Sequence, residues 1–144
     1  MNQYRWSDLV VGLRHEFEAT ITEEMMERFL RDTGDRNPLH VDARYAKEKG
    51  FKGAVVYGLL TASLYSTLAG VHLPGKHCLL QGIDISFLNP VYAGDRLKVS
   101  GEIAYLNDSC RQAEIRAQIV NSAGVKVSRA KIKVGVLAQD PVCA

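Results

Sequence analysis

Two side chains suited to proton transfer lie close together in the first third of the chain. Asp35 and His40 are separated by five positions in the stretch from Thr33 to His40. On a continuous helix, five positions correspond to about 140° of rotation, which would place the two side chains on different faces. Pro38 disfavours a helical backbone at Asn37, so we predict a bend there. A bend can direct a carboxylate and an imidazole to one point, where the pair could bind a water molecule and move its protons.

Structural roles explain the same two residues at least as simply. A turn aspartate often accepts hydrogen bonds from the backbone that follows it, and His40 could satisfy a nearby carbonyl group. Composition alone favours these structural roles. The elements around the bend therefore decide which chemistry it can support.

Three helices are predicted in the first half of the chain. Residues 22–34 begin with Thr22 as an N-cap and end at Gly34, and two glutamates occupy the first turn, where the helix dipole favours them. A short helix follows in residues 41–50. The third helix, residues 58–70, has no charged side chain and mixes leucines with small residues. A helix that is apolar on every side must be surrounded by protein, so we expect this one to be central.

The second half of the chain changes to a two-residue period, which is typical of strands with one solvent-exposed face. The predicted strands cover residues 15–21, 77–90, 96–107, 110–121 and 124–137. Turn residues join the last three as an antiparallel meander. In the first strand of the meander, Val99, Ile103 and Tyr105 should share one side. About five strands with one apolar face, together with one apolar helix, predict an α+β fold in which the sheet wraps around the helix.

Length and composition limit the classes of function. A chain of 144 residues with 47% hydrophobic and 24% charged residues is typical of one globular domain with a core of its own. A net charge of +2 is too small to indicate a nucleic-acid partner. Polar residues interrupt every apolar run well before the roughly 20 residues of a membrane helix, so we expect no membrane partner.

Metal-binding and disulfide patterns are not found in the sequence. The cysteines and the remaining histidines are widely scattered: Cys78, Cys110, Cys143, His15, His72 and His77. This spacing fits neither a disulfide framework nor a metal site, so we predict no metal. Three reduced cysteines and an N-terminus without the order of a signal peptide predict a cytoplasmic protein.

The bend and the apolar helix together resemble a known family. Residues 34–40 read Gly-Asp-Arg-Asn-Pro-Leu-His, which is similar to the Gly-Asp-x-Asn-Pro-Leu-His motif of the MaoC-like, (R)-specific enoyl-CoA hydratases. Residues 56–64 also resemble the family, and the similarity extends over roughly residues 10 to 135. The resemblance implies a hotdog fold, in which a single domain over residues 1–144 has a central helix at about 58–70 and an overhanging helical segment at about 22–50.

The resemblance also implies roles for individual residues. Asp35 and His40 would bind and polarise a catalytic water, and Gly58 would donate its backbone N–H to the thioester oxygen. The substrate-binding residues would be Asn37, Tyr57 and Ser66. Ser66 is explained equally well as a small residue that allows the helix to pack.

Tyr57 is a departure from the family pattern. The relatives commonly have histidine immediately before the helix glycine, whereas this chain has tyrosine. A tyrosine hydroxyl can also donate a hydrogen bond, but it is longer and stays neutral at working pH. Core packing accounts for Tyr57 equally well.

The function implied is a hydro-lyase of fatty acid metabolism that adds water to a trans-2-enoyl thioester and gives an (R)-3-hydroxyacyl thioester. Two alternatives stay open: a hotdog acyl thioesterase, which the absence of an acidic residue in 58–70 disfavours, and a non-catalytic acyl-thioester-binding subunit. We expect no cofactor beyond the coenzyme A or acyl-carrier phosphopantetheine of the substrate. The resemblance further implies a homodimer or a higher homo-oligomer. Basic residues on the strands, such as Arg116 and Lys131, could hold phosphates or an acidic carrier protein, although a solvated sheet face is the simpler interpretation.

Overall fold

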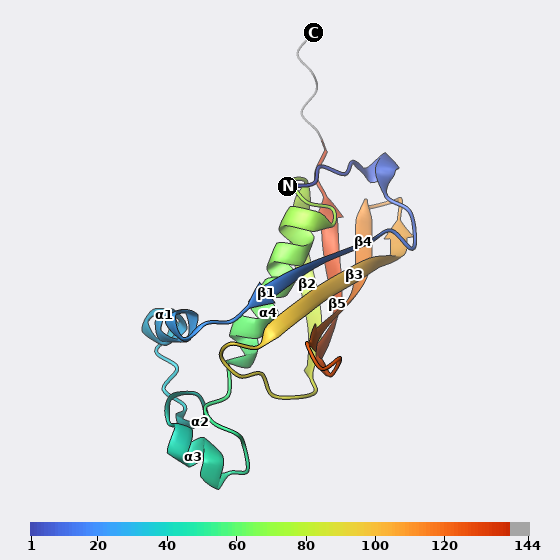
Figure 1. Cartoon of the computed structure of the whole chain (residues 1–144). Helices are drawn as coiled ribbons and strands as arrows, with labels where there is room; N and C mark the ends of the chain where they lie inside the picture. The colour runs from blue at the N-terminus through green and yellow to red at the C-terminus, as the bar shows by residue number, and fades with distance from the viewer. Residues whose placement is uncertain (139–144) are drawn as a thin grey trace.

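The computed structural model describes residues 1–138 and shows a curled antiparallel sheet with one helix in its hollow (Figure 1). The helices are α1 (Glu23–Thr33), α2 (Pro38–Val41), α3 (Ala43–Glu48) and α4 (Gly58–Thr67), with a short 3-10 helix η1 (Trp6–Asp8) and a π-helical turn η2 (Leu68–His72). The strands are β1 (Arg14–Thr20), β2 (Cys78–Phe87), β3 (Arg96–Asn107), β4 (Gln112–Asn121) and β5 (Lys126–Val136). These elements confirm the predicted α+β class and the hotdog arrangement.

The sheet has the strand order β1-β3-β4-β5-β2, so the three strands of the predicted meander are neighbours at its centre. The alternation predicted for β4 is confirmed, because its inward-facing side chains are buried: Ala113, Ile115, Ala117 and Ile119. The placement of Tyr105 with Val99 and Ile103 is wrong. The pairing between β3 and β4 shifts between Ile103 and Tyr105, and this irregularity leaves Tyr105 58% exposed.

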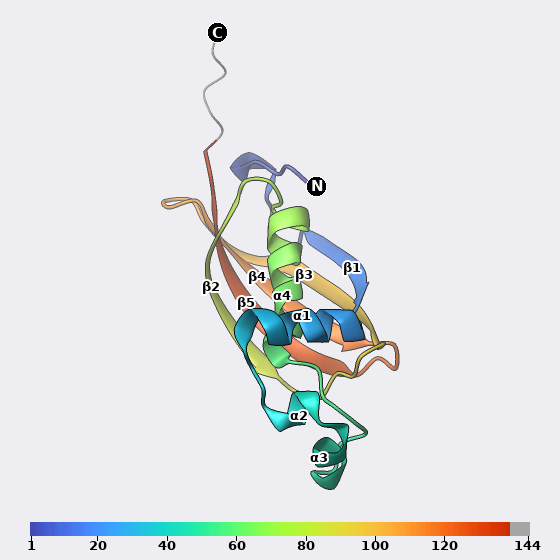
Figure 2. The same ribbon diagram turned by 90° about the vertical axis from the view of Figure 1, so that its left-hand side faces the viewer.

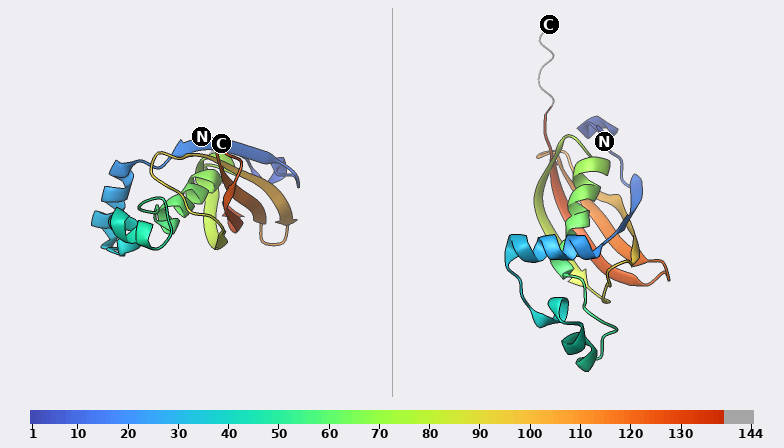
Figure 3. Two further views of the ribbon diagram at one scale, coloured as in Figure 1. Left: turned by 60° about the horizontal axis from the view of Figure 1, so that its bottom comes forward. Right: turned by 60° about the vertical axis from the view of Figure 1, so that its left-hand side comes forward.

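The central helix is buried on the side that faces the sheet and open on the other. Tyr65 and Leu68 are fully buried, whereas Leu59 is 68% exposed and Ser63 and Ser66 are also exposed. The sheet arches over α4 from one side only (Figure 3). The expectation that protein surrounds the whole helix is therefore not met within one copy of the chain.

The segment before α4 forms the predicted overhang. Helix α1 crosses in front of α4, and α2 and α3 lie beyond the end of the sheet (Figure 2). The Thr22 hydroxyl accepts a hydrogen bond from the Met25 N–H at 3.2 Å, and Gly34 ends α1 in a left-handed conformation (φ 71°). The prediction missed α2, which begins at Pro38 because proline is well tolerated in the first turn of a helix.

Two further observations bear on the predictions from composition. Within residues 1–138, no helix is long and apolar enough to cross a membrane. Cys78 and Cys110 are free thiols, and Cys143 lies outside the described residues.

Candidate active site

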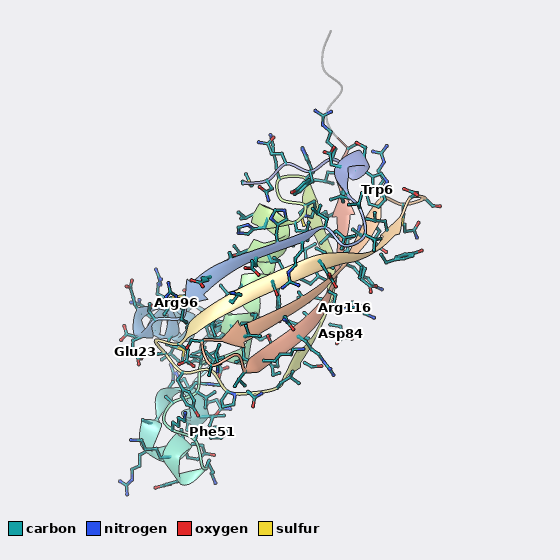
Figure 4. All side chains as sticks on the ribbon, turned by 45° about the vertical axis from the view of Figure 1, so that its right-hand side comes forward. Trp6, Glu23, Phe51, Asp84, Arg96 and Arg116 are labelled. Atoms are coloured by element: carbon teal, nitrogen blue, oxygen red, sulfur yellow. The ribbon has the colours of Figure 1, made fainter. Side chains whose placement is uncertain are left out.

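A pocket of 360 Å³ lies where the overhang, the beginning of α4, the end of β2 and the start of β5 meet. Its walls include His40 and Phe51 from the overhang, Gly58 and Thr61 from α4, and Phe87 from β2. Figure 4 shows Phe51 among the side chains of the overhang, beyond the end of the sheet. The walls are mainly apolar with a few polar groups, which is typical of a small-molecule site.

The bend between α1 and α2 is held by hydrogen bonds within the bend itself. The Asp35 carboxylate accepts a hydrogen bond from the Asn37 N–H through Oδ1 at 3.1 Å. The Asn37 side chain in turn accepts one from the Leu39 N–H at 3.0 Å and so caps α2. Asp35 therefore has the turn role that composition favours, and its second carboxylate oxygen is left for other partners, because the side chain is exposed.

His40 also has the structural partner that composition suggested. Its Nδ1 lies 2.7 Å from the Val55 carbonyl oxygen, and the Val55 N–H donates to the Leu39 carbonyl at 3.0 Å. A carbonyl oxygen only accepts, so Nδ1 must carry a proton and donate it. In the neutral ring, Nε2 is then the unprotonated nitrogen, and it can accept a proton from a water or a substrate. The hydrogen bond from His40 Nδ1 to the Val55 carbonyl therefore selects the tautomer with an unprotonated Nε2, which is the tautomer that general base catalysis requires.

Tyr57 connects the two halves of the site. It is only 2% exposed, and its ring packs against the rings of His40 and Phe29 with centroid distances of 4.4 and 4.5 Å. Its hydroxyl donates to the Asp35 carbonyl oxygen at 2.8 Å. Burial and then the Asp35 charge raise the pKa of this hydroxyl, so it remains a neutral donor. Tyr57 therefore holds Asp35 and His40 in one unit, and its hydroxyl is already occupied by the backbone.

Gly58 opens α4 at the pocket. Tyr57 is the N-cap of α4, so the Gly58 N–H lies in the first helical turn, where backbone N–H groups have no partner within the helix. Within the described chain no carbonyl accepts a hydrogen bond from it. A Cβ at this position would lie 3.1 Å from the Phe87 ring, which explains why a residue without a side chain suits this wall.

Comparison with known proteins identifies the family. The family model described as "MaoC like domain" matches residues 11–125. The chain belongs to the MaoC-like family. An (R)-specific enoyl-CoA hydratase from Aeromonas caviae is 37% identical over 81% of this chain and 87% of its own length. A 3-hydroxybutyryl-CoA dehydratase from Methylorubrum extorquens is 34% identical over 76% of this chain and 70% of its own length.

Solved structures of the family agree with the fold. The solved structure of an (R)-hydratase from A. caviae has a TM-score of 0.84 and 29% identity, over 90% of this chain and 98% of that one. An (R)-hydratase from Pseudomonas aeruginosa also has a TM-score of 0.84 and 29% identity, over 97% and 95%. The MaoC-like chain thus has the hotdog fold that its motif implied.

Of the predicted site residues, two line this MaoC-like pocket, His40 and Gly58, and four do not: Asp35, Asn37, Tyr57 and Ser66. Ser66 is exposed on the open side of α4, opposite the side that carries Tyr65, and does not line the pocket. Of the basic strand residues, Arg116 lies on the outer face of the sheet (Figure 4), 3.9 Å from Glu102, and Lys131 lies 3.9 Å from Glu114. The solvated-face interpretation fits these basic side chains best.

Sequence reasoning missed several residues of the pocket. Val55 acts through its carbonyl oxygen, which every residue has, so no side-chain pattern could have indicated it. Phe87 is the last residue of β2 and reaches the pocket only because β2 lies beside the helix start. Thr61, by contrast, carried a signal, because it is a polar residue on the buried side of an apolar helix.

Proposed function

We propose that this hydro-lyase adds water across the double bond of a trans-2-enoyl thioester and gives the (R)-3-hydroxyacyl thioester, or runs the reverse dehydration. The observation that carries the proposal is the pocket that contains both the His40 ring and the free N–H of Gly58. The His40 ring can exchange protons with water, and the Gly58 N–H can bind a substrate oxygen that gains negative charge during the reaction. We propose the (R) configuration of the product because a relative of this chain is named an (R)-specific enoyl-CoA hydratase. A role in fatty acid metabolism is proposed from the same resemblance.

In the proposed reaction, Asp35 and His40 bind the water that attacks C3. One water proton passes to the pair as the C3–O bond forms, and one proton passes from the pair to C2 as the C2–C3 π bond is lost. The sum is the addition of one water molecule, so no other reactant is needed. The fixed Nδ1–H of His40 leaves Nε2 for this exchange, and Asn37 would orient the substrate with its amide nitrogen.

Gly58 would stabilise the intermediate of the same reaction. As the C3–O bond forms, negative charge builds on the thioester oxygen, which becomes an enolate oxygen. A backbone N–H at a helix N-terminus interacts more strongly with that charge than with the neutral carbonyl of the substrate. The Gly58 N–H therefore lowers the barrier more than it tightens substrate binding.

The addition of water needs no oxidant or reductant, so we propose that no cofactor takes part beyond the coenzyme A or carrier phosphopantetheine attached to the acyl group. Within residues 1–138, no three or more His, Cys, Asp or Glu side chains are grouped so as to hold a metal ion. The free thiols of Cys78 and Cys110 support a cytoplasmic location.

We further propose that two copies of the chain pair along β2. The two edge strands of the sheet differ: β1 carries charged residues such as Glu16 and Glu18, whereas β2 exposes apolar side chains. The exposed apolar residues of β2 are Leu79, Leu80, Ile83 and Phe87, and Leu59 lies on the open side of α4. An open apolar edge strand tends to pair with another chain. A second copy would cover this edge and the open side of α4, and light scattering during gel filtration would detect the dimer.

The test of the function is the absorbance of the conjugated enoyl group in crotonyl-coenzyme A. Its loss, with 3-hydroxybutyryl-coenzyme A as the product, would support the hydratase, and chiral analysis of the product would establish the (R) configuration. Release of free coenzyme A would instead indicate a thioesterase. No turnover of crotonyl or longer enoyl thioesters, bound to either coenzyme A or carrier protein, would contradict the proposal.

A further inference from the structure

Thr61 carries a hydroxyl that the free protein leaves without a partner. The residue is 3% exposed on the sheet-facing side of α4, and its Oγ1 is the buried side-chain polar atom of the described chain that makes no hydrogen bond. Buried polar groups are nearly always hydrogen-bonded, because losing water without a replacement partner is unfavourable. The unpaired hydroxyl of Thr61 therefore needs a physical explanation.

The next hydroxyl on the same side of the helix shows that partners are within reach. Tyr65, one turn further along α4, is fully buried, and its hydroxyl lies 2.7 Å from Ser128 Oγ on β5. The sheet thus supplies a partner for Tyr65 and none for Thr61. Thr61 and Ser128 both line the pocket that contains His40.

A second unpaired group lies one turn before Thr61. The Gly58 N–H lines the same pocket and donates to no carbonyl of the described chain. Side chains on an α-helix point back toward its N-terminus, so the Thr61 hydroxyl lies over the turn that begins at Gly58. Two unsatisfied hydrogen-bonding groups of one helical turn therefore border one pocket.

We propose that Thr61 is a further catalytic residue, whose hydroxyl donates a second hydrogen bond, beside that of the Gly58 N–H, to the thioester oxygen of the substrate. This inference rests on the proposed function, because it assigns the oxygen that the hydroxyl meets. The bond strengthens as that oxygen becomes an enolate, so it acts more on kcat than on KM. The free protein retains the unpaired hydroxyl because its partner arrives with the substrate.

The inference predicts opposite effects on stability and on catalysis. Thr61→Val has nearly the same shape and removes only the unpaired hydroxyl, so the melting temperature of the free protein should rise. The same substitution should lower kcat for crotonyl-coenzyme A about tenfold or more and raise KM by a smaller factor, because the neutral carbonyl oxygen of the substrate accepts a weaker hydrogen bond than the enolate oxygen. Thr61→Ser keeps the hydroxyl, so its kcat should stay within about threefold of the unsubstituted protein. If the hydroxyl had a purely structural role, its removal would not raise the melting temperature and lower kcat at the same time.

A matched control lies on the same helix. Thr67→Val makes the same chemical change at a position that does not line the pocket, and it should leave kcat unchanged. The inference is overturned if Thr61→Val keeps full kcat, or if it loses stability and activity together.

Binding of butyryl-coenzyme A tests Thr61 independently of turnover. This saturated thioester presents the same oxygen but cannot be hydrated. It should raise the melting temperature of the unsubstituted protein and of Thr61→Ser more than that of Thr61→Val. If this difference is seen while enoyl thioesters are not turned over, Thr61 keeps its role in binding the thioester and the proposed reaction fails. An equal shift in all three proteins, or no shift in any, overturns the inference.

Discussion

The bend at Asp35–His40 and the first turn of α4 border the same site but are built in opposite ways. Asp35 and Asn37 are exposed and use their side chains to hold the neighbouring backbone. Tyr57 and Thr61 are buried, and their positions depend on packing between the overhang, the helix and the sheet. Groups that exchange protons with water must reach water, whereas groups that stabilise charge act most strongly where water is excluded.

The two regions should therefore respond differently to substitution. Changes to the exposed carboxylate of the bend, Asp35, should affect the reaction and leave the stability of the fold nearly unchanged, because few buried contacts are lost. Changes to His40, whose ring contacts the Val55 carbonyl, should also affect stability. Changes in the first turn of α4 should affect both. Tyr57 belongs to the buried region but contacts both residues of the proposed proton-transfer pair, so it should show an intermediate behaviour.

The largest effect is expected from the bend. Asp35→Asn keeps the oxygen that accepts from the Asn37 N–H but removes the charge, so kcat/KM for an enoyl thioester should fall by about 10²-fold or more, with little change in melting temperature. Asp32→Asn, at an exposed carboxylate near the end of α1, is the matched control and should keep full activity. Full activity in Asp35→Asn would contradict the assignment.

His40→Ala should reduce kcat/KM by a similar factor but should also lower the melting temperature. The difference arises because the Val55 carbonyl oxygen loses the donor that the His40 ring provides. Enzyme assays and thermal unfolding of Asp35→Asn and His40→Ala, measured side by side, would show whether the two variants lose similar activity but differ in melting temperature. Equal melting temperatures would contradict the role of the Val55 contact.

Gly58 offers a test of the backbone donor itself. Proline is tolerated in the first turn of a helix, and the extended backbone of Tyr57 (ψ 124°) suits a residue before proline. Gly58→Pro removes the N–H, whereas Gly58→Ala keeps it and adds a similar Cβ near Phe87. Relative to Gly58→Ala, Gly58→Pro should lose about 10²- to 10³-fold in kcat. Equal rates in two folded variants would show that this N–H does not bind the reacting oxygen.

Tyr57→Phe should have a smaller effect. The ring still packs against His40, but the hydrogen bond to the Asp35 carbonyl is lost, so kcat should fall about tenfold and stability by about 1 kcal/mol. Tyr65→Phe is the matched control, since it also removes a buried hydroxyl with one partner. Tyr65→Phe should lower the stability by a similar amount and leave kcat unchanged. Equal kcat values for Tyr57→Phe and Tyr65→Phe would argue against a positioning role for Tyr57.

The smallest effect concerns the other end of the central helix. Burial, and then His15 and the N-terminal amine, lower the pKa of His72, whose ring stacks on Phe17. The unfolded chain therefore binds this proton more readily than the folded protein, so His72 should reduce stability as the pH falls below about 6.5. His72→Phe keeps a stacked ring without a proton to bind, and its melting temperature should fall less between pH 7 and pH 5. The pH dependence of kcat should not change, because Gly58 begins α4 and His72 ends η2, at opposite ends of the central helix.

Local patterns predicted the elements of this fold and missed the contacts between them. Thr22 and Gly34 bound α1 as expected, because capping depends on neighbouring residues. The alternation in β4 identified its buried face, whereas the shift in pairing that exposes Tyr105 depends on the partner strand and was missed. Pro38 predicts a break in the helix, and in the structure it also begins α2, because the Asn37 side chain caps that helix.

The fold class, the bend and the family could be predicted from the sequence, because turn residues, periodicity and a contiguous motif act over a few positions along the chain. The tertiary structure was needed to show that the Val55 carbonyl fixes the tautomer of His40, and that Tyr57 joins Asp35 to His40 through its hydroxyl and its ring. It also decided that Ser66 lies outside the pocket while Thr61 lines it. These contacts join residues from different elements, and their geometry is set by how the overhang and the sheet pack around α4.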